Sequence, residues 1–105
     1  MSTPRIEALE KMLRSRPGDP RLLFGLALEY LNAGDRDEGV RKLRAYLDVA
    51  DDEGNAWGRL GAVLRDLGRD DEAREAYRRG IAEATRHGHP TMAAEFEDVL
   101  EGWEA

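Results

Sequence analysis

One apolar pattern occurs twice in this chain, at an interval of 34 residues. Leu23, Leu26, Ala27 and Tyr30 follow one another at spacings of 3, 1 and 3, and the segment that begins at Trp57 has the same spacings. Spacings of this kind place side chains on one face of an α-helix. The chain therefore repeats a helical unit, and any fold proposed for it must contain that unit twice.

The same interval relates a second helical stretch in each copy. Gly39 and Leu43 of the first copy correspond to Ala73 and Tyr77 of the second. A small residue lets two helices approach closely, and a large residue fills the space that remains between them. We therefore expect each copy to be a pair of antiparallel helices whose apolar face is completed by a neighbouring copy.

Glycine and proline predict where these helices begin and end. Gly34 and Gly68 suit the left-handed residue that follows the end of a helix. Gly88 has the same role after the second copy, and Pro90 suits the first turn of a further helix. Each copy is thus bounded by signals that agree with its apolar pattern.

The two ends of the chain predict one more helix each. The apolar residues of 4–16 match those of the second helix of the first copy, and Pro17 follows them. Residues 90–104 carry one apolar stripe of helical period. We predict a single all-α domain over 1–105, with a half-repeat helix at 4–16, repeats at 20–53 and 54–87, and a capping helix at 90–104.

The repeated unit resembles the tetratricopeptide repeat (TPR), whose signature is W-x2-L-G-x2-Y, then A-x3-F, then a proline. The second copy matches it as Trp57-x2-Leu60-Gly61-x2-Leu64 with Ala73-x3-Tyr77. The first copy matches it as Leu23-x2-Leu26-Ala27-x2-Tyr30 with Gly39-x3-Leu43. The resemblance covers residues 5–87 and implies a right-handed α-solenoid of antiparallel helical hairpins, with about six helices.

Three positions depart from the family pattern. Asp51 and Thr85 stand where the closing proline is usual, and Tyr46 replaces a small residue. These departures affect the spacing of the helices and the exit from each repeat. The second copy fits the signature better than the first.

The resemblance also implies where a partner would bind, because the first helix of each TPR hairpin lines a concave surface that holds segments of partner proteins. Phe24, Leu28 and Leu31 form a second apolar stripe that the hairpin itself is not expected to require. Such a stripe flanked by arginines suits an amphipathic or acidic peptide. The side chains expected on this surface are Arg21, Phe24, Leu28, Leu31, Arg59, Ala62, Arg65 and Asp66.

Other interpretations of this stripe stay open. Phe24 and Leu31 would equally pack against a neighbouring first helix or against the capping helix, or form a contact between two copies of the chain. Contiguous exposed apolar patches are uncommon on monomers. The sequence therefore predicts a noncatalytic protein-interaction module with a protein or peptide partner, and a structural homo-oligomer that uses the same stripe is the alternative.

Charge and hydropathy exclude several other classes of partner. The chain has 16 basic and 22 acidic residues, so its net charge of −6 has the wrong sign for general attraction to nucleic acid or an anionic membrane. It has no apolar run long enough to span a bilayer, and its first residues lack the apolar centre of a signal peptide. We expect a cytoplasmic protein.

The sequence predicts neither an enzyme nor a metal site. There is no cysteine. His87 and His89 are two residues apart, and Glu83 lies one helical turn before His87. This is only a weak indication of a metal site, because the spacing does not bring a third ligand together with both histidines. No potential nucleophile has a histidine at a spacing that would let it act as the catalytic base. The sequence contains no glycine-rich phosphate-binding loop. We therefore expect no catalytic residue, no metal and no cofactor.

Acidic residues near predicted helix ends have structural interpretations. Asp52 is expected to cap the helix of Trp57, and Asp70 and Asp71 to cap the helix of Tyr77. Residues 91–105 contain acidic but no basic side chains. We expect these to form the solvated outer face of the capping helix, with a docking face for a basic partner as the alternative.

Overall fold

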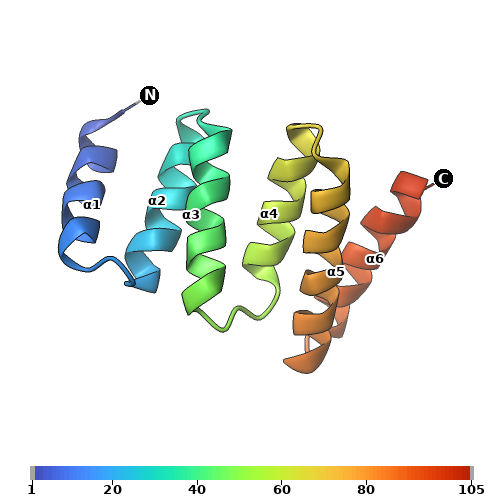
Figure 1. The fold of residues 1–105 in the computed structure, drawn as a ribbon. Helices are drawn as coiled ribbons and strands as arrows, with labels where there is room; N and C mark the ends of the chain where they lie inside the picture. Colours follow the sequence, from blue (N-terminus) through green and yellow to red (C-terminus); the bar gives the residue numbers. More distant parts are fainter. Residues whose placement is uncertain (1, 105) are drawn as a thin grey trace. The chain divides into compact units, whose positions relative to one another are not determined.

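The structure, a computed structural model, describes residues 2–104 of the chain. Over these residues it contains six α-helices and no strand (Figure 1). The chain divides into unit 1, Met1–Ala50, and unit 2, Asp51–Ala105. The helices of unit 1 are α1 (Pro4–Ser15), α2 (Pro20–Asn32) and α3 (Arg36–Val49), and those of unit 2 are α4 (Asn55–Asp66), α5 (Asp70–Arg86) and α6 (Pro90–Glu104).

Side chains that accept hydrogen bonds from otherwise unpaired amides define where most of these helices begin. In unit 1 each of the three helices has such a cap, provided in turn by Thr3, Asp19 and Asp35. In unit 2 the Asp52 carboxylate accepts hydrogen bonds from the amides of Gly54 and Ala56, at 2.9 and 3.0 Å. The prediction that Asp52 caps the helix of Trp57 is confirmed.

The same prediction is wrong for Asp70 and Asp71. The helix α5 begins at Asp70, so both residues lie in its first turn. The residue at the cap position is Arg69, which makes no side-chain cap hydrogen bond. The two carboxylates still favour the helix there, because its N-terminal end carries partial positive charge.

Glycines end three of the helices in the left-handed conformation, as predicted. The φ angle is 85° at Gly34, 75° at Gly68 and 78° at Gly88. After α2, the Gly34 amide donates to the carbonyl oxygen of Leu31, and the next amide donates to the carbonyl oxygen of Tyr30. These bonds satisfy the last carbonyl groups of the helix and turn the chain toward α3.

The core of unit 1 lies between the antiparallel helices α2 and α3 (Figure 1). It includes Leu23, Leu26, Ala27 and Leu43 of the repeated pattern together with Leu22 and Val40, and α1 adds Ile6 where it packs on α2. All of them are buried, with exposed fractions of 7 % or less. The buried set is Ile6, Leu22, Leu23, Leu26, Ala27, Val40 and Leu43.

Unit 2 repeats this arrangement with α4 and α5 and adds α6, which packs on α5 (Figure 1). A Cβ atom added at Gly61 would lie 2.8 Å from the ring of Tyr77, which explains the small residue at this position of the repeat. The helix α6 adds Ala93 to the core. The buried apolar side chains are Ala56, Leu60, Leu64, Ala73, Ala76, Tyr77, Ala84 and Ala93.

Candidate protein-interaction surface

Side chains of α4 and α6 line a groove of about 310 Å³ in unit 2, which we call the α4–α6 groove. Two of the residues that the sequence predicted for the binding surface, Arg59 and Ala62, belong to it, and both are exposed. The groove therefore lies on the predicted face of α4. Its lining residues are Asn55, Gly58, Arg59, Ala62, Met92, Glu95 and Phe96.

Phe96 is the largest apolar side chain of the groove, and two glycines make room for it. A Cβ atom added at Gly58 would lie 2.5 Å from the Phe96 ring, and one added at Gly80 would lie 2.9 Å from it. The ring centroid of Phe96 lies 5.7 Å from that of Tyr77. Burial among these groups raises the pKa of Tyr77.

A second pocket, of about 470 Å³, adjoins the groove at the turn between α5 and α6. It shares Met92 and Glu95 with the α4–α6 groove. Its other lining residues come from the turn and the first residues of α6: Gly88, His89, Pro90 and Thr91. The accessible surface thus continues from the groove to the turn.

Arg65 and Asp66, also predicted for the binding surface, are exposed but do not line the groove. The guanidinium group of Arg65 lies 4.3 Å from the ring centroid of Trp103, and that of Arg74 lies 4.6 Å from it. These are cation–π distances. Arg65 therefore contacts the last turns of α6, a role that the sequence did not predict.

In unit 1, Arg21 is exposed and Phe24, Leu28 and Leu31 are half-buried. The Phe24 ring centroid lies 5.0 Å from that of Tyr46 on α3.

Leu31 packs against α3 as well, because a Cβ atom added at Gly39 would overlap its side chain. The expectation that the hairpin does not require this stripe is thus wrong for Phe24 and Leu31. Both side chains fill space between the two helices of their own hairpin.

Sequence reasoning missed the residues that α6 brings to the groove. The sequence predicts one apolar stripe on the capping helix but does not place that stripe against a particular site. A signal for it was present: Gly58 and Gly80 occupy the positions that Phe24 and Tyr46 hold in the first copy. Two aromatic-to-glycine differences indicate that a large side chain from elsewhere fills the space.

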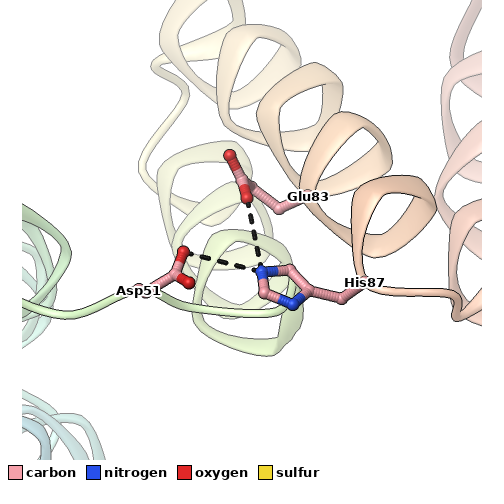
Figure 2. A group of neighbouring side chains, drawn as sticks. All are labelled: Asp51, Glu83 and His87. Atoms are coloured by element: carbon pink, nitrogen blue, oxygen red, sulfur yellow. Dashed lines mark ion pairs between the residues drawn. The ribbon is translucent and has the colours of Figure 1, made fainter.

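A group of polar side chains lies where the segment before α4 meets the end of α5 (Figure 2). The Arg86 guanidinium donates hydrogen bonds to Asp51 and Glu83, at 2.6 and 2.7 Å. The bond from Arg86 holds the pKa of Asp51 below its usual value. His87 Nε2 lies 3.5 Å from an Asp51 oxygen and 3.8 Å from a Glu83 oxygen.

The second histidine has a different partner. His89 Nε2 pairs with Glu53, and this contact lowers the pKa of the Glu53 carboxyl group. His87 and His89 are two residues apart in the chain but form two separate pairs with acidic residues that precede α4. They do not converge on one point.

Comparisons with known proteins place this geometry in a family. The model of the tetratricopeptide repeat family matches residues 1–84. The TPR repeat-containing protein PA0015 of Pseudomonas aeruginosa is 35% identical over 95 residues, which cover 90% of each chain. The solution structure of protein BPP2914 from Bordetella parapertussis is 31% identical with a TM-score of 0.74, over 96% of this chain and 87% of that one. The chain belongs to the tetratricopeptide repeat family.

The chain is also similar to a short part of a much longer protein. The peroxisomal targeting signal receptor of Eremothecium gossypii is 38% identical over 63 residues, which cover 60% of this chain but 11% of the receptor. The match therefore concerns a short part of the receptor and not the receptor as a whole.

Membership confirms the all-α helical repeat fold that the sequence predicted. TPR domains commonly mediate interactions between proteins and are typically noncatalytic. Within residues 2–104, no helix is both long and apolar enough to cross a membrane.

Proposed function

We propose that this chain is a noncatalytic interaction module that holds a segment of a partner protein in the α4–α6 groove. The observation that carries this proposal is the groove itself, which opens on the predicted face of α4 and contains Arg59 and Ala62. Its apolar lining comes from Ala62, Met92 and Phe96. An apolar pocket with a few polar groups at its rim is the usual form of a ligand site.

The size and charges of the groove indicate the chemistry of the partner. A volume of about 310 Å³ is at the lower end of the range for ligand pockets, so it suits one large apolar side chain of a peptide. The groove has one basic and one acidic side chain, Arg59 and Glu95. Arg59 would contact a carboxylate beside that anchor, Glu95 would accept from a donor group of the partner, and Asn55 can donate to or accept from the peptide backbone. We therefore propose an amphipathic segment with an acidic residue next to its apolar anchor. A relative named as a targeting-signal receptor agrees with recognition of a short segment.

The remaining residues of the predicted surface belong to this proposal in lesser roles. In unit 1, Leu28 and Arg21 on α2 would add apolar and charged contacts, while Phe24 and Leu31 already contact α3. In unit 2, Arg65 and Asp66 would contact the partner beyond the end of the groove.

The test uses Ala62→Glu, which places a charged side chain in the groove without removing a core contact, since Ala62 is exposed. The matched control is Ala82→Glu, because Ala82 is an exposed alanine of α5 that does not line the groove. Proteins captured by the wild-type chain from its own cells are identified, and the affinity of one captured partner is measured for all three chains. We expect Ala62→Glu to weaken binding by roughly tenfold or more and Ala82→Glu to leave it unchanged. Equal affinities for the three chains would contradict the proposal.

The alternative function is a homo-oligomer whose contact is formed by Phe24, Leu28 and Leu31 on α2. Light scattering over a dilution series distinguishes it from the proposed interaction module. The proposed module gives the mass of one chain at every concentration. A mass that rises with concentration, and that Leu28→Asp returns to one chain, would support the oligomer instead.

A further inference from the structure

We propose that Asp51, Glu83 and His87 form a binding site for a divalent transition-metal ion, with Zn²⁺ as the ion that fits best (Figure 2). Each residue offers one ligand atom, and the three atoms all lie within 4.8 Å of one another. Glu83 and His87 are one helical turn apart at the end of α5, and Asp51 comes from the segment before α4.

The distances between the donor atoms fit this ion. His87 Nε2 lies 3.5 Å from the Asp51 oxygen and 3.8 Å from the Glu83 oxygen. In tetrahedral zinc sites the metal–ligand bonds are about 2.0–2.2 Å, which puts neighbouring ligand atoms roughly 3.3–3.5 Å apart. The Asp51 and Glu83 oxygens lie within 4.8 Å of each other, so these two donors would have to approach by up to about 1.3 Å to bind one ion.

A second observation is the environment of the His87 imidazole. The Nε2 atom of His87 is buried, and its nearest acceptors, the Asp51 and Glu83 oxygens, lie at 3.5 and 3.8 Å, beyond ordinary hydrogen-bond distance. It is directed into the space between the two carboxylates (Figure 2). Buried polar atoms are nearly always hydrogen-bonded, so an exception in contact with two carboxylates indicates a ligand position.

Arg86 is the competitor of such an ion. Its guanidinium group bridges the same Asp51 and Glu83 oxygens that face His87. Arg86 Nη2 lies 2.6 Å from the Asp51 oxygen and 2.7 Å from the Glu83 oxygen, so it occupies the space between them, and a metal ion that binds both oxygens must displace it. The side chain of Arg86 is 57% exposed and can turn into solvent. Arg86 therefore limits the affinity of the site, and its removal should raise that affinity.

The donor set also determines which ion is selected. One imidazole nitrogen and two carboxylates suit Zn²⁺ and its neighbours, while Ca²⁺ and Mg²⁺ prefer six or more oxygen ligands. Three protein ligands leave a fourth position for water. A bound ion would tie the segment before α4 to the end of α5, next to the turn that lines the second pocket.

The test is calorimetric titration of ZnCl₂ into the metal-free 105-residue chain. We expect one Zn²⁺ per wild-type chain, with a dissociation constant in the micromolar range, and no comparable binding of Mg²⁺. His87→Asn should weaken binding by roughly tenfold or more, and Arg86→Gln should strengthen it several-fold. The matched control is His89→Asn, which removes the neighbouring histidine that pairs with Glu53 and should leave Zn²⁺ affinity unchanged.

A second measurement separates ligand loss from unfolding. Zn²⁺ should raise the melting temperature of the wild-type chain and of His89→Asn, but not that of His87→Asn or Glu83→Gln. The proposal is overturned if the wild-type chain binds no Zn²⁺ at about 100 µM, or if His89→Asn weakens binding as much as His87→Asn. Because Ala62→Glu leaves these three ligands intact, it should bind Zn²⁺ normally, so the outcome is independent of the groove.

Discussion

At the positions where unit 1 has Phe24 and Tyr46, unit 2 has Gly58 and Gly80. In unit 1 the two rings contact each other, with centroids 5.0 Å apart. In unit 2 the two glycines leave space that the ring of Phe96 fills from α6. The same pair of positions is thus covered by the hairpin itself in one unit and by the next helix in the other.

This difference shows how a repeat controls what packs against it. The buried positions of the two hairpins agree in kind, because both need a small residue where the helices approach and large residues around it. Positions 24/58 and 46/80 differ, because the space at them is filled by the hairpin's own rings in unit 1 and by Phe96 in unit 2. A hairpin with glycine at both positions receives a large side chain from another helix, and in unit 2 this side chain also lines the α4–α6 groove.

The largest expected effect is that of Phe96→Ala. Removing this ring should lower the free energy of unfolding by about 3 kcal/mol, since the ring packs between α4 and α5 and neither glycine can fill the cavity. Urea denaturation of the 105-residue chain measures the loss. Hydrogen exchange should show that the amides of α6 lose more protection than those of α2.

An equal loss of protection in both units would contradict this prediction. It would mean that Phe96 supports the whole chain and not the attachment of α6.

Gly80→Ala tests the same space from the opposite side. The added Cβ atom would lie 2.9 Å from the Phe96 ring and 3.3 Å from Trp57 Cβ, so we expect a loss of about 1.5 kcal/mol in the free energy of unfolding. The control is Gly102→Ala, because a Cβ atom added there meets no heavy atom within 4 Å. Alanine at this exposed helical position should stabilise the chain by about 0.5–1 kcal/mol. If Gly80→Ala stabilised the chain as Gly102→Ala does, the space would not be filled.

The same pair of positions shows what the sequence could and could not predict. The helices, their glycine ends and the buried residues follow from local patterns, since a period of helical spacing and a left-handed glycine are properties of short segments. The packing of Phe96 against Gly58 and Gly80 does not follow from local patterns, because these three residues are far apart in the chain. Glycine carries no side chain that would indicate which residue it admits.

The polar residues follow the same division. Glu83 and His87 are neighbours on one helical turn, which spacing alone revealed. Asp51 reaches them only through the path of the segment before α4, and Arg65 reaches Trp103 only through the course of α6. Local spacing therefore relates two of the three residues Asp51, Glu83 and His87, and only the tertiary structure shows the third residue and the contact of Arg65 with Trp103.

Phe24→Ala is the counterpart of the first prediction in unit 1. We expect it to lower the free energy of unfolding by about 1–1.5 kcal/mol, since the half-buried ring loses part of its apolar burial as well as its contact with the Tyr46 ring. Urea denaturation measures this loss beside that of Phe96→Ala. A loss as large as that of Phe96→Ala would mean that the aromatic pair is as essential to unit 1 as the inserted ring is to unit 2.

The smallest expected effect is that of Arg65→Met, at the position that corresponds to Leu31 of unit 1. Leu31 packs against Gly39 of its own hairpin, whereas Arg65 contacts Trp103 of α6. Methionine keeps the apolar contact with the ring and removes only the charge, and Arg74 stays 4.6 Å from the ring centroid, so we expect a loss of about 0.5 kcal/mol in the free energy of unfolding. The control is Arg78→Met, since Arg78 is an exposed arginine of α5 whose ion pair with Glu75 is long, at 3.8 Å. If Arg65→Met cost as much as Phe96→Ala, α6 would be held mainly by its last turns, and Gly58 and Gly80 would not determine its attachment.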